Sequence, residues 1–370
     1  MSQSKRESYI KSIHIEGLFG ATDVLIPFDN PCTILVGENG LGKTQILSIL
    51  YYFLQRDSKA LKQFDFKTVT ITFSNDATTT ATKNGKGLVS FTANVLQTST
   101  QKELLFLPTY RRVEVNAQMA GLTTNNGLGG LLQFDMADVE ELLDTRLKEI
   151  NTELEGFLDK AGKDMTKNLL SPPAIDMKFF NDIKLEEVEI MLKRAKDFLT
   201  EDAEKRIFKI VKQKRYTPGD ESRAAFLKIL MAVYDSQREK DAAFRHFIKT
   251  CNGYLFNKQI VYDEHNVQVY IINNADKELT FSQLSSGEKQ IVSIFSKLYL
   301  SDLKKEFIVI FDEPELSISI FWQKLLLPDI MKSKKVVTLL AATHSPFIFE
   351  NDLDTSAIAL SACINEAVTA

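Results

Sequence analysis

Eight consecutive residues, Gly37 to Thr44, have the types and the spacing that a phosphate-binding loop requires. Their sequence, GENGLGKT, fits the pattern G-x-x-x-x-G-K-[ST] and stands between a short apolar run and a segment with helical spacing. Glycines let a backbone wrap around phosphate oxygens, and N–H groups at a helix N-terminus favour an anion. We predict that Lys43 reaches the β- and γ-phosphates and that the Thr44 hydroxyl binds Mg²⁺. The predicted phosphate-contacting residues are Gly37, Glu38, Asn39, Gly40, Leu41, Gly42, Lys43 and Thr44.

A pair of acidic residues follows the apolar run FIVIF at positions 307–311. A carboxylate at the carboxyl end of a buried parallel strand lies in the usual ligand crevice of an α/β sheet. Asp312 is predicted to hold Mg²⁺, directly or through water, and Glu313 to act as the general base for an attacking water molecule. A strand that ends in Asp-Glu is a weak signal alone, but it gains weight beside a phosphate-binding loop.

Two further motifs occur in the C-terminal third. The segment LSSGEKQ, residues 284–290, opens a predicted helix and is either a second anion-binding helix N-terminus or a simple capping motif. Its candidate nucleotide-contacting residues are Ser285, Ser286, Gly287 and Glu288. His344 follows an apolar strand in the segment AATHSPF, and a histidine in such a place is by itself more often structural than catalytic.

The elements that position these residues follow from apolar periodicity. A helix is predicted from Gln45, a second after Ser286 and a third over 318–334. Between them, 136–249 is a Leu-, Glu- and Lys-rich helical region, broken at 171–173 and 217–220. A Gly-, Asn- and Thr-rich loop is predicted at 121–130. The predicted strands are 9–16, 24–28, 32–36, 68–73, 87–95, 259–263, 267–273, 307–311 and 336–342. The plan is α/β, then a helical insertion, then α/β.

The overall composition narrows the class of protein. The chain has 370 residues, 44% hydrophobic and 25% charged, which is ordinary for a globular protein with a sizeable core. Lys and Arg number 45 against 49 Asp and Glu, so the net charge of -4 gives no general attraction to nucleic acid. Three distant cysteines exclude a disulfide framework and a CxxC metal site. No signal peptide or membrane-length apolar run is seen, so we expect a cytoplasmic protein with no membrane partner.

The four motifs occur in the order found in the ABC ATPases, which the chain resembles over roughly residues 9–110 and 251–350. This resemblance implies an α/β, ABC-type P-loop ATPase head, a mixed sheet with flanking helices, and a helical insertion between its two lobes. It implies domains at 1–130, 131–250 and 251–370, with His344 as a γ-phosphate sensor. It also implies ATP and Mg²⁺ as ligands and a homodimer or higher homo-oligomer, in which one subunit's signature segment faces the other's Lys43. Residues 315–317 resemble the D-loop, which contacts the opposite nucleotide site.

The long insertion resembles that of the SMC/RecF/OLD branch, because 244 positions separate Lys43 from Gly287. Four segments, at 107–114, 284–300, 312–319 and 342–352, are similar to the ATPase subunit of Septu-type anti-phage systems, including those attached to retrons. This implies an ATPase that senses infection and controls a separate HNH nuclease. Only 26 residues follow His344, so no nuclease domain is expected within the chain. The alternatives are a RecF-like repair ATPase that binds DNA directly and a scaffold that rarely hydrolyses ATP.

Three features of the sequence each allow two interpretations. Gln97 or Gln101 is a candidate for the Q-loop glutamine, and either is equally well explained as a surface residue. Arg111 and Arg112 are candidates for an anion contact or a structural ion pair. The basic run Lys205–Arg215 either binds a nucleic-acid backbone or is a solvated helix face.

Overall fold

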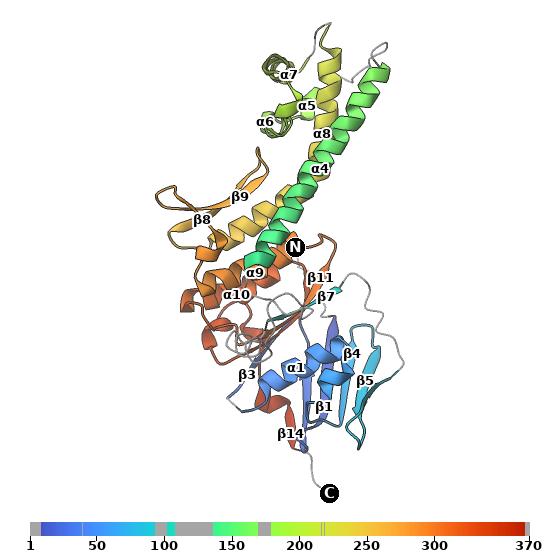
Figure 1. Ribbon diagram of the computed structural model, residues 1–370. Helices are drawn as coiled ribbons and strands as arrows, with labels where there is room; N and C mark the ends of the chain where they lie inside the picture. Colours follow the sequence, from blue (N-terminus) through green and yellow to red (C-terminus); the bar gives the residue numbers. More distant parts are fainter. Residues whose placement is uncertain are drawn as a thin grey trace. The chain divides into compact units, whose positions relative to one another are not determined.

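The computed structural model describes residues 9–38, 40–92, 102–107, 136–168, 179–215, 217 and 219–366 (Figure 1). The chain forms two compact units, each described here by itself. The first unit comprises 1–134, 286–290 and 304–370, and the second comprises 135–285 and 291–303. Across the described ranges, no helix is long and apolar enough to cross a membrane. The predicted loop at 121–130 and the predicted break at 171–173 lie outside the described residues.

A five-stranded parallel sheet forms the centre of the first unit, with the strand order β13-β3-β12-β11-β7. Its strands are β3 (Cys32–Val36), β7 (Lys102–Leu107), β11 (Glu306–Asp312), β12 (Val336–Thr343) and β13 (Ala357–Ala359). Strands β11 and β12 are buried almost throughout, as expected for a parallel sheet covered on both faces. Since β12 lies between β3 and β11, three segments distant in sequence end side by side.

An antiparallel sheet forms a second layer of this unit, in the order β14-β2-β1-β4-β5-β6. Its strands are β1 (Ile10–Leu18), β2 (Thr22–Pro27), β4 (Thr68–Phe73), β5 (Thr78–Lys83), β6 (Val89–Phe91) and β14 (Ile364–Glu366). Strand β4 alternates strictly between half-buried and buried residues, so one face of the sheet is apolar. Besides α1 (Lys43–Leu54) and the start of α9 (Ser286–Leu300), the helices described in this unit are α2 (Ser58–Leu61), α10 (Ile320–Lys332), η3 (Pro346–Ile348), η4 (Asp354–Ser356) and η5 (Leu360–Cys363).

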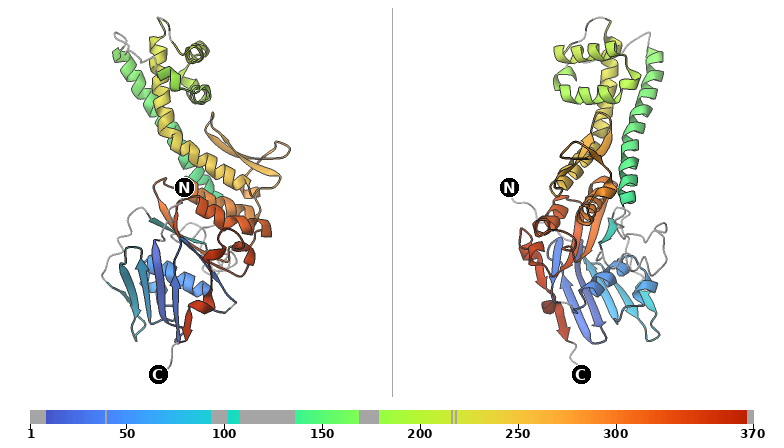
Figure 2. Two further views of the ribbon diagram at one scale, coloured as in Figure 1. Left: turned by 180° about the vertical axis from the view of Figure 1, so that it is seen from behind. Right: turned by 60° about the vertical axis from the view of Figure 1, so that its left-hand side comes forward.

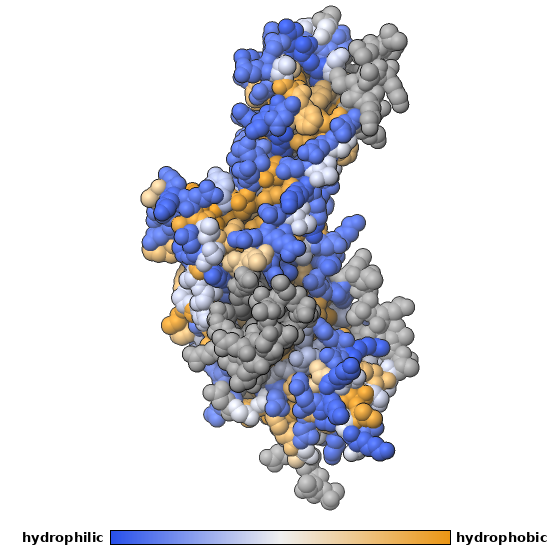
Figure 3. All heavy atoms as spheres, viewed as in Figure 1, coloured by the Kyte–Doolittle hydropathy of each residue, from blue (hydrophilic) through white to orange (hydrophobic). Residues whose placement is uncertain are grey.

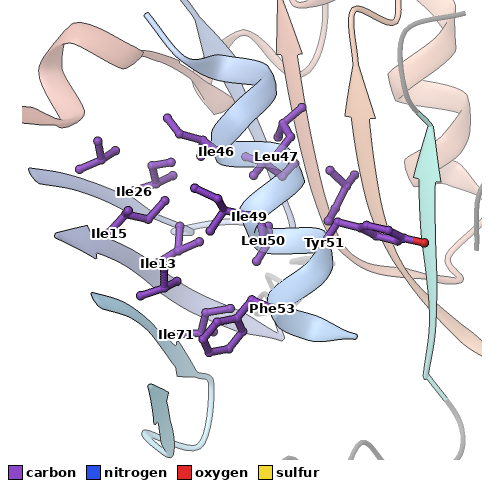
Figure 4. Close-up of a cluster of buried hydrophobic side chains, with 14 of the residues drawn as sticks. Ile13, Ile15, Ile26, Ile46, Leu47, Ile49, Leu50, Tyr51, Phe53 and Ile71 are labelled. Carbon is purple, nitrogen blue, oxygen red and sulfur yellow. The ribbon is translucent and has the colours of Figure 1, made fainter. Parts of the chain in front are cut away.

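Helix α1 (Lys43–Leu54) lies between the two sheets and joins their cores (Figure 4). On one side Ile46, Ile49 and Phe53 face the antiparallel sheet, where they belong to the same buried cluster as its isoleucines. On another side Tyr51 stacks on Phe106 of β7, with ring centroids 4.7 Å apart. Because α1 packs through apolar side chains on both sides, the two sheets fix the position of Lys43, its first residue.

The second unit is built on two long helices, α4 (Met136–Asn168) and α8 (Glu221–Asn252), which run side by side (Figures 1 and 2). Three shorter helices contribute to a separate buried cluster with α8. These are α5 (Phe179–Asp182), α6 (Leu185–Arg194) and α7 (Glu201–Gln213), and two of them, α6 and α7, pack directly on α8. The unit also holds η1 (Lys196–Phe198), η2 (Phe281–Gln283) and a small sheet of β8 (Lys258–Asp263), β9 (Gln268–Asn273) and β10 (Glu278–Leu279). Helix α9 (Ser286–Leu300) begins in the first unit, and its residues from 291 onwards belong to the second.

A buried ionic cluster ties the elements of the second unit together. The Arg194 guanidinium donates to Asp241 Oδ1 at 2.8 Å, to Gln237 Oε1 at 2.7 Å and to the Glu264 carbonyl at 2.7 Å. Tyr262 also donates to Asp241 Oδ1, and Gln237 Nε2 donates to the Ile150 carbonyl at 2.8 Å. One arginine therefore holds α6, α8 and the segment after β8, while Gln237 extends the contact to α4.

The α/β fold predicted from the sequence is the fold observed. The predicted strand at 32–36 coincides with β3, and the strands predicted at 307–311 and 336–342 are β11 and β12. Strand β5 was missed because its sequence, TTTATK, has no large apolar residue to mark alternation. The strand predicted over 87–95 is shorter, since β6 covers 89–91 and residues 93–95 lie outside the described part. The division into two lobes and an insertion at 130 and 250 stays a prediction.

Candidate functional site

The loop between β3 and α1 has the backbone geometry of an anion cradle. Gly40 and Gly42 have φ values of 90° and 84°, in the left-handed region that residues with a Cβ rarely adopt. The carbonyl of Gly42 accepts the N–H of Ile46 at 2.9 Å, so helix α1 begins directly behind the loop. The unpaired N–H groups of a helix's first turn point toward any ligand held there. Asn39, predicted to contact phosphate, lies outside the described residues.

Lys43 is the buried cation of this loop. Its Nζ donates to the carbonyl of Gly37 at 2.6 Å and to that of Glu38 at 2.9 Å, and it lies 3.5 Å from Nδ1 of His344. Burial lowers the pKa of Lys43, while the nearby carboxylates of Glu313, Asp312 and Glu315 oppose that shift. The ammonium group is therefore satisfied by the loop's own carbonyls, and it is close to three acidic side chains.

The acidic pair stands at the carboxyl end of β11. Asp312 is buried, and Glu313 adopts a left-handed φ of 50° while its N–H donates to the carbonyl of Ala342 at 2.8 Å. A non-glycine residue in this region is strained, and such strain is common at functional sites. Burial raises the pKa of Glu313, and repulsion from Asp312 and Glu315 adds to the increase. A carboxyl group with a raised pKa is suited to accept a proton.

A third carboxylate, Glu315, joins the loop after β11 to the end of β12. Its Oε2 accepts the Thr343 hydroxyl at 2.7 Å, and its Oε1 accepts the backbone N–H of His344 at 2.8 Å. Gln323 of α10 braces the same region, because its Nε2 lies 3.3 Å from the carbonyls of Glu315 and Ile318. Sequence reasoning named Glu315 only as part of a D-loop, and no spacing signal marks this contact.

The signature segment begins helix α9. Ser285 and Ser286 are exposed, whereas Gly287 and Glu288 are buried. A Cβ on Gly287 would lie 2.4 Å from the carbonyl oxygen of Ser317 and 3.2 Å from the Trp322 ring. Glycine is therefore required here because the helix start is in close contact with the loop after β11.

Phe19 is a neighbour of the phosphate-binding loop that sequence reasoning missed. A Cβ on Gly42 would lie 2.7 Å from the Phe19 ring, so the two residues are in contact. Phe19 has a left-handed φ of 55° and is 47% exposed. Its position between β1 and β2 carries no sequence signal for this contact.

The structure brings most of the predicted residues to one edge of the parallel sheet. Strands β3, β12 and β11 are neighbours, and Thr343 pairs with Val36 while Asp312 pairs with Ala342. The phosphate-binding loop, the acidic pair and His344 therefore start from adjacent strand ends. The basic run Lys205–Arg215 belongs to the second unit. Four other candidates lie outside the described residues: Gln97, Gln101, Arg111 and Arg112.

A lysine-bearing glycine loop opposite an acidic pair at the carboxyl end of a parallel sheet defines a P-loop ATPase domain. The chain belongs to the family described as "AAA domain, putative AbiEii toxin, Type IV TA system", whose model matches residues 32–350. That span includes the phosphate-binding loop, the signature segment, the acidic pair and His344. No match to a curated protein was found.

Among solved structures, the chain is similar to SMC head domains. An Smc head bound to the C-winged helix domain of ScpA has a TM-score of 0.44 and 15% identity, with 92% of this chain and 90% of that chain covered. An Smc head with an extended coiled coil from Pyrococcus furiosus has a TM-score of 0.42, 17% identity and coverage of 92% and 91%. An Smc head with a coiled coil and joint from Pyrococcus yayanosii has a TM-score of 0.44, 14% identity and coverage of 92% and 93%.

Proposed function

We propose that the protein binds and hydrolyses ATP at the edge formed by β3, β12 and β11. The observation that carries this proposal is the convergence of Lys43, Glu313 and His344 from three adjacent strands. In the reaction, the Glu313 carboxylate takes a proton from water as the water oxygen bonds to the γ-phosphorus. The bond between that phosphorus and the β–γ bridging oxygen breaks, giving ADP and phosphate. Lys43 leaves the loop carbonyls to pair with phosphate oxygens, and His344 contacts the γ-phosphate.

The side chains of the site suit a nucleotide with Mg²⁺. The left-handed glycines form a cradle that a Cβ would disturb, and the loop holds a buried lysine next to it. Mg²⁺ is commonly bound by one or two protein oxygens together with phosphates, and Thr44 and Asp312 supply such oxygens. When bound, the ion neutralises charge on the β- and γ-phosphates.

ATP-dependent assembly of two chains is part of the proposal. Ser285 and Ser286 are exposed at the start of α9, where a second chain's nucleotide could be gripped. Beside the loop after β11, Ile320 and Phe321 are 55% and 65% exposed. Large apolar side chains exposed next to a functional loop are typical of a contact surface. The signature residues of one chain would then complete the site of the other.

The test measures ATPase rate and solution mass with and without ATP·Mg²⁺, for the wild type and Glu313→Gln. We expect the wild type to hydrolyse ATP and the variant to accumulate as a nucleotide-bound dimer or larger assembly. A protein that neither binds ATP nor changes mass would rule out this function.

We further propose that the ATPase senses infection and controls a separate HNH nuclease in anti-phage defence. The support is the similarity of residues 107–114, 284–300, 312–319 and 342–352 to Septu-type ATPase subunits. Coexpression with any HNH nuclease encoded next to this protein tests the idea. We expect a copurifying complex that protects cells from phage and loses protection with Lys43→Ala. Absence of an adjacent nuclease and of phage protection would contradict it.

A second candidate function is direct nucleic-acid binding through α7, as a RecF-like repair protein would require. Lys205 and Arg206 form exposed ion pairs with Glu201 and Asp202. Within the described residues, no acidic side chain pairs with the exposed Lys209, Lys212, Lys214 or Arg215. Figure 3 shows mostly hydrophilic side chains over this helix.

Fluorescence anisotropy with a labelled DNA duplex tests this candidate. Replacing Lys209 and Lys212 by glutamate should weaken binding and flatten its salt dependence. The control is Lys205→Glu, which alters a cation that already has an acidic neighbour. Equal binding by all variants would exclude this surface.

A further inference from the structure

A single carboxylate spans the point where β12 ends. The Thr343 hydroxyl and the His344 backbone N–H are donors from consecutive residues, and both reach Glu315, at 2.7 Å and 2.8 Å. Hydrogen bonds to an ionised acceptor are shorter and stronger than neutral ones. The last residue of the strand and the first residue beyond it are thereby fixed to the loop after β11.

Gln323 closes the same brace from the other side. Its Oε1 accepts the Ser345 hydroxyl at 2.6 Å, while its Nε2 reaches the carbonyls of Glu315 and Ile318. The N–H of Ser345 also donates to the Thr343 hydroxyl oxygen at 3.0 Å. Residues on both sides of His344 are therefore held by polar side chains from the opposite segment.

The backbone of His344 is fixed in this way, but its side chain is exposed. Its Nδ1 lies 3.5 Å from Lys43 Nζ, so the ring reaches the phosphate-binding lysine. With the backbone fixed, the direction of the ring depends on two side-chain torsions alone. Small displacements of such a group are costly to catalysis, since a shift of about 1 Å can lower a rate about 100-fold.

We infer that Glu315 is a positioning residue that aims His344 at the γ-phosphate. This inference rests on the proposed ATPase function. Its consequence is a direct link between the loop after β11 and His344. The same loop carries Glu313, and its Ser317 is in close contact with Gly287. Movement of the loop would displace His344, so the site responds to the packing of the signature helix.

A nuclear magnetic resonance experiment tests the link without any need for hydrolysis. The chain has four histidines, so selective ¹⁵N-histidine labelling gives four backbone amide signals, and His344→Gln identifies one of them. Glu315→Ala should shift the His344 amide signal and speed its exchange with water. Thr343→Val should give a partial shift, because one of the two bonds remains. Glu350→Ala, at a nearby exposed position, is the control and should shift nothing.

Glu315→Gln separates geometry from charge. A glutamine oxygen can accept the His344 N–H while its amide donates to the Thr343 hydroxyl oxygen, so this variant should restore the amide signal. An unchanged His344 signal in Glu315→Ala would overturn the inference whether or not the protein hydrolyses ATP.

Kinetics provide the second readout. Glu315→Ala should lower kcat about 10- to 100-fold with little change in KM for ATP, and Glu315→Gln should recover most of it. In a His344→Ala background, Glu315→Ala should cost nothing more, because the two residues act as one unit. If the two losses multiply instead, Glu315 acts independently of His344 and the inference is wrong. A wild type without ATPase activity would disprove the proposed function and leave the amide signal to decide this one.

Discussion

The Nζ of Lys43 lies 3.5 Å from Nδ1 of His344, although 301 positions separate the two residues. The contact exists because β3 and β12 are neighbouring parallel strands whose carboxyl ends coincide. The lysine is also held by the carbonyls of Gly37 and Glu38. The Lys43 ammonium is therefore held by its own loop, close to the histidine expected to share its ligand.

Replacing Lys43 should weaken nucleotide binding and leave the fold intact. Lys43→Ala removes a buried charged donor, and a hydrogen bond to a charged group contributes about 1.5–3 kcal/mol. We expect the Kd for ATP to rise at least about 10-fold, measured by titration calorimetry. Circular dichroism should give an unchanged spectrum, because the carbonyls that accept from Lys43 belong to the loop and to no helix or strand. Wild-type affinity in this variant would contradict the assigned role.

Glu313→Gln should slow hydrolysis and keep ATP binding. Loss of a general base lowers a rate by about 10²- to 10⁴-fold. The measurement is single-turnover ATP hydrolysis, and the control is Glu350→Gln, which is exposed and outside the site. Because the pKa of Glu313 is raised, activity should fall on acidification at a higher pH than an ordinary glutamate would give. A pH profile in the wild type with no such acid limb would argue against Glu313 as the base.

The Glu313→Gln substitution should also stabilise the protein in the absence of nucleotide. The folded-state pKa of Glu313 lies above its unfolded value, so its contribution to stability is full at low pH and is lost as pH rises through the folded value. At neutral pH the ionised carboxylate therefore disfavours folding. Thermal unfolding should show a higher Tm for Glu313→Gln than for the wild type at pH 8, with the difference shrinking toward pH 4. An equal or lower Tm at pH 8 would contradict this account.

Two glycine-to-alanine substitutions should change the free energy of unfolding in opposite directions. A Cβ at Gly287 would press on the Ser317 carbonyl, and overpacking costs about 1–3 kcal/mol. At Gly156, inside α4, a Cβ meets nothing within 4 Å, so alanine should stabilise by about 0.5–1 kcal/mol. Urea unfolding measures both. Tolerance of Gly287→Ala would show that the helix start can move away from the loop.

Removing Arg194 should strongly destabilise the second unit. The arginine and Asp241 are almost fully buried, and Asp241 Oδ2 has no hydrogen-bond partner among the described residues. Arg194→Met would leave a buried carboxylate without its cation, which costs about 3–5 kcal/mol. Lys205→Met is the matched control, since its pair with Glu201 is exposed and should contribute less than about 0.5 kcal/mol. Denaturant midpoints of the two variants give the comparison. A similarly small loss of stability in both would contradict the structural role given to Arg194.

The sequence predicted the local parts of this molecule well. The strand at 32–36, the glycine loop and the helix behind it are adjacent in the chain, so apolar pattern and glycine placement were enough to find them. The acidic pair was likewise visible as the end of an apolar run. Prediction from the local sequence fails where no large apolar residue marks a strand, as in β5.

Only the tertiary structure decided how these parts meet. The strand order placed β12 between β3 and β11, and that order brings Lys43 to His344. The clamp of Glu315 on Thr343 and His344, the contact of Gly287 with Ser317 and the cluster around Arg194 all join residues distant in sequence. Spacing along a chain records periodicity within one element, whereas these contacts depend on which elements become neighbours. The motifs were therefore readable from the sequence, and the connections between them became visible once the sheets and helices had packed.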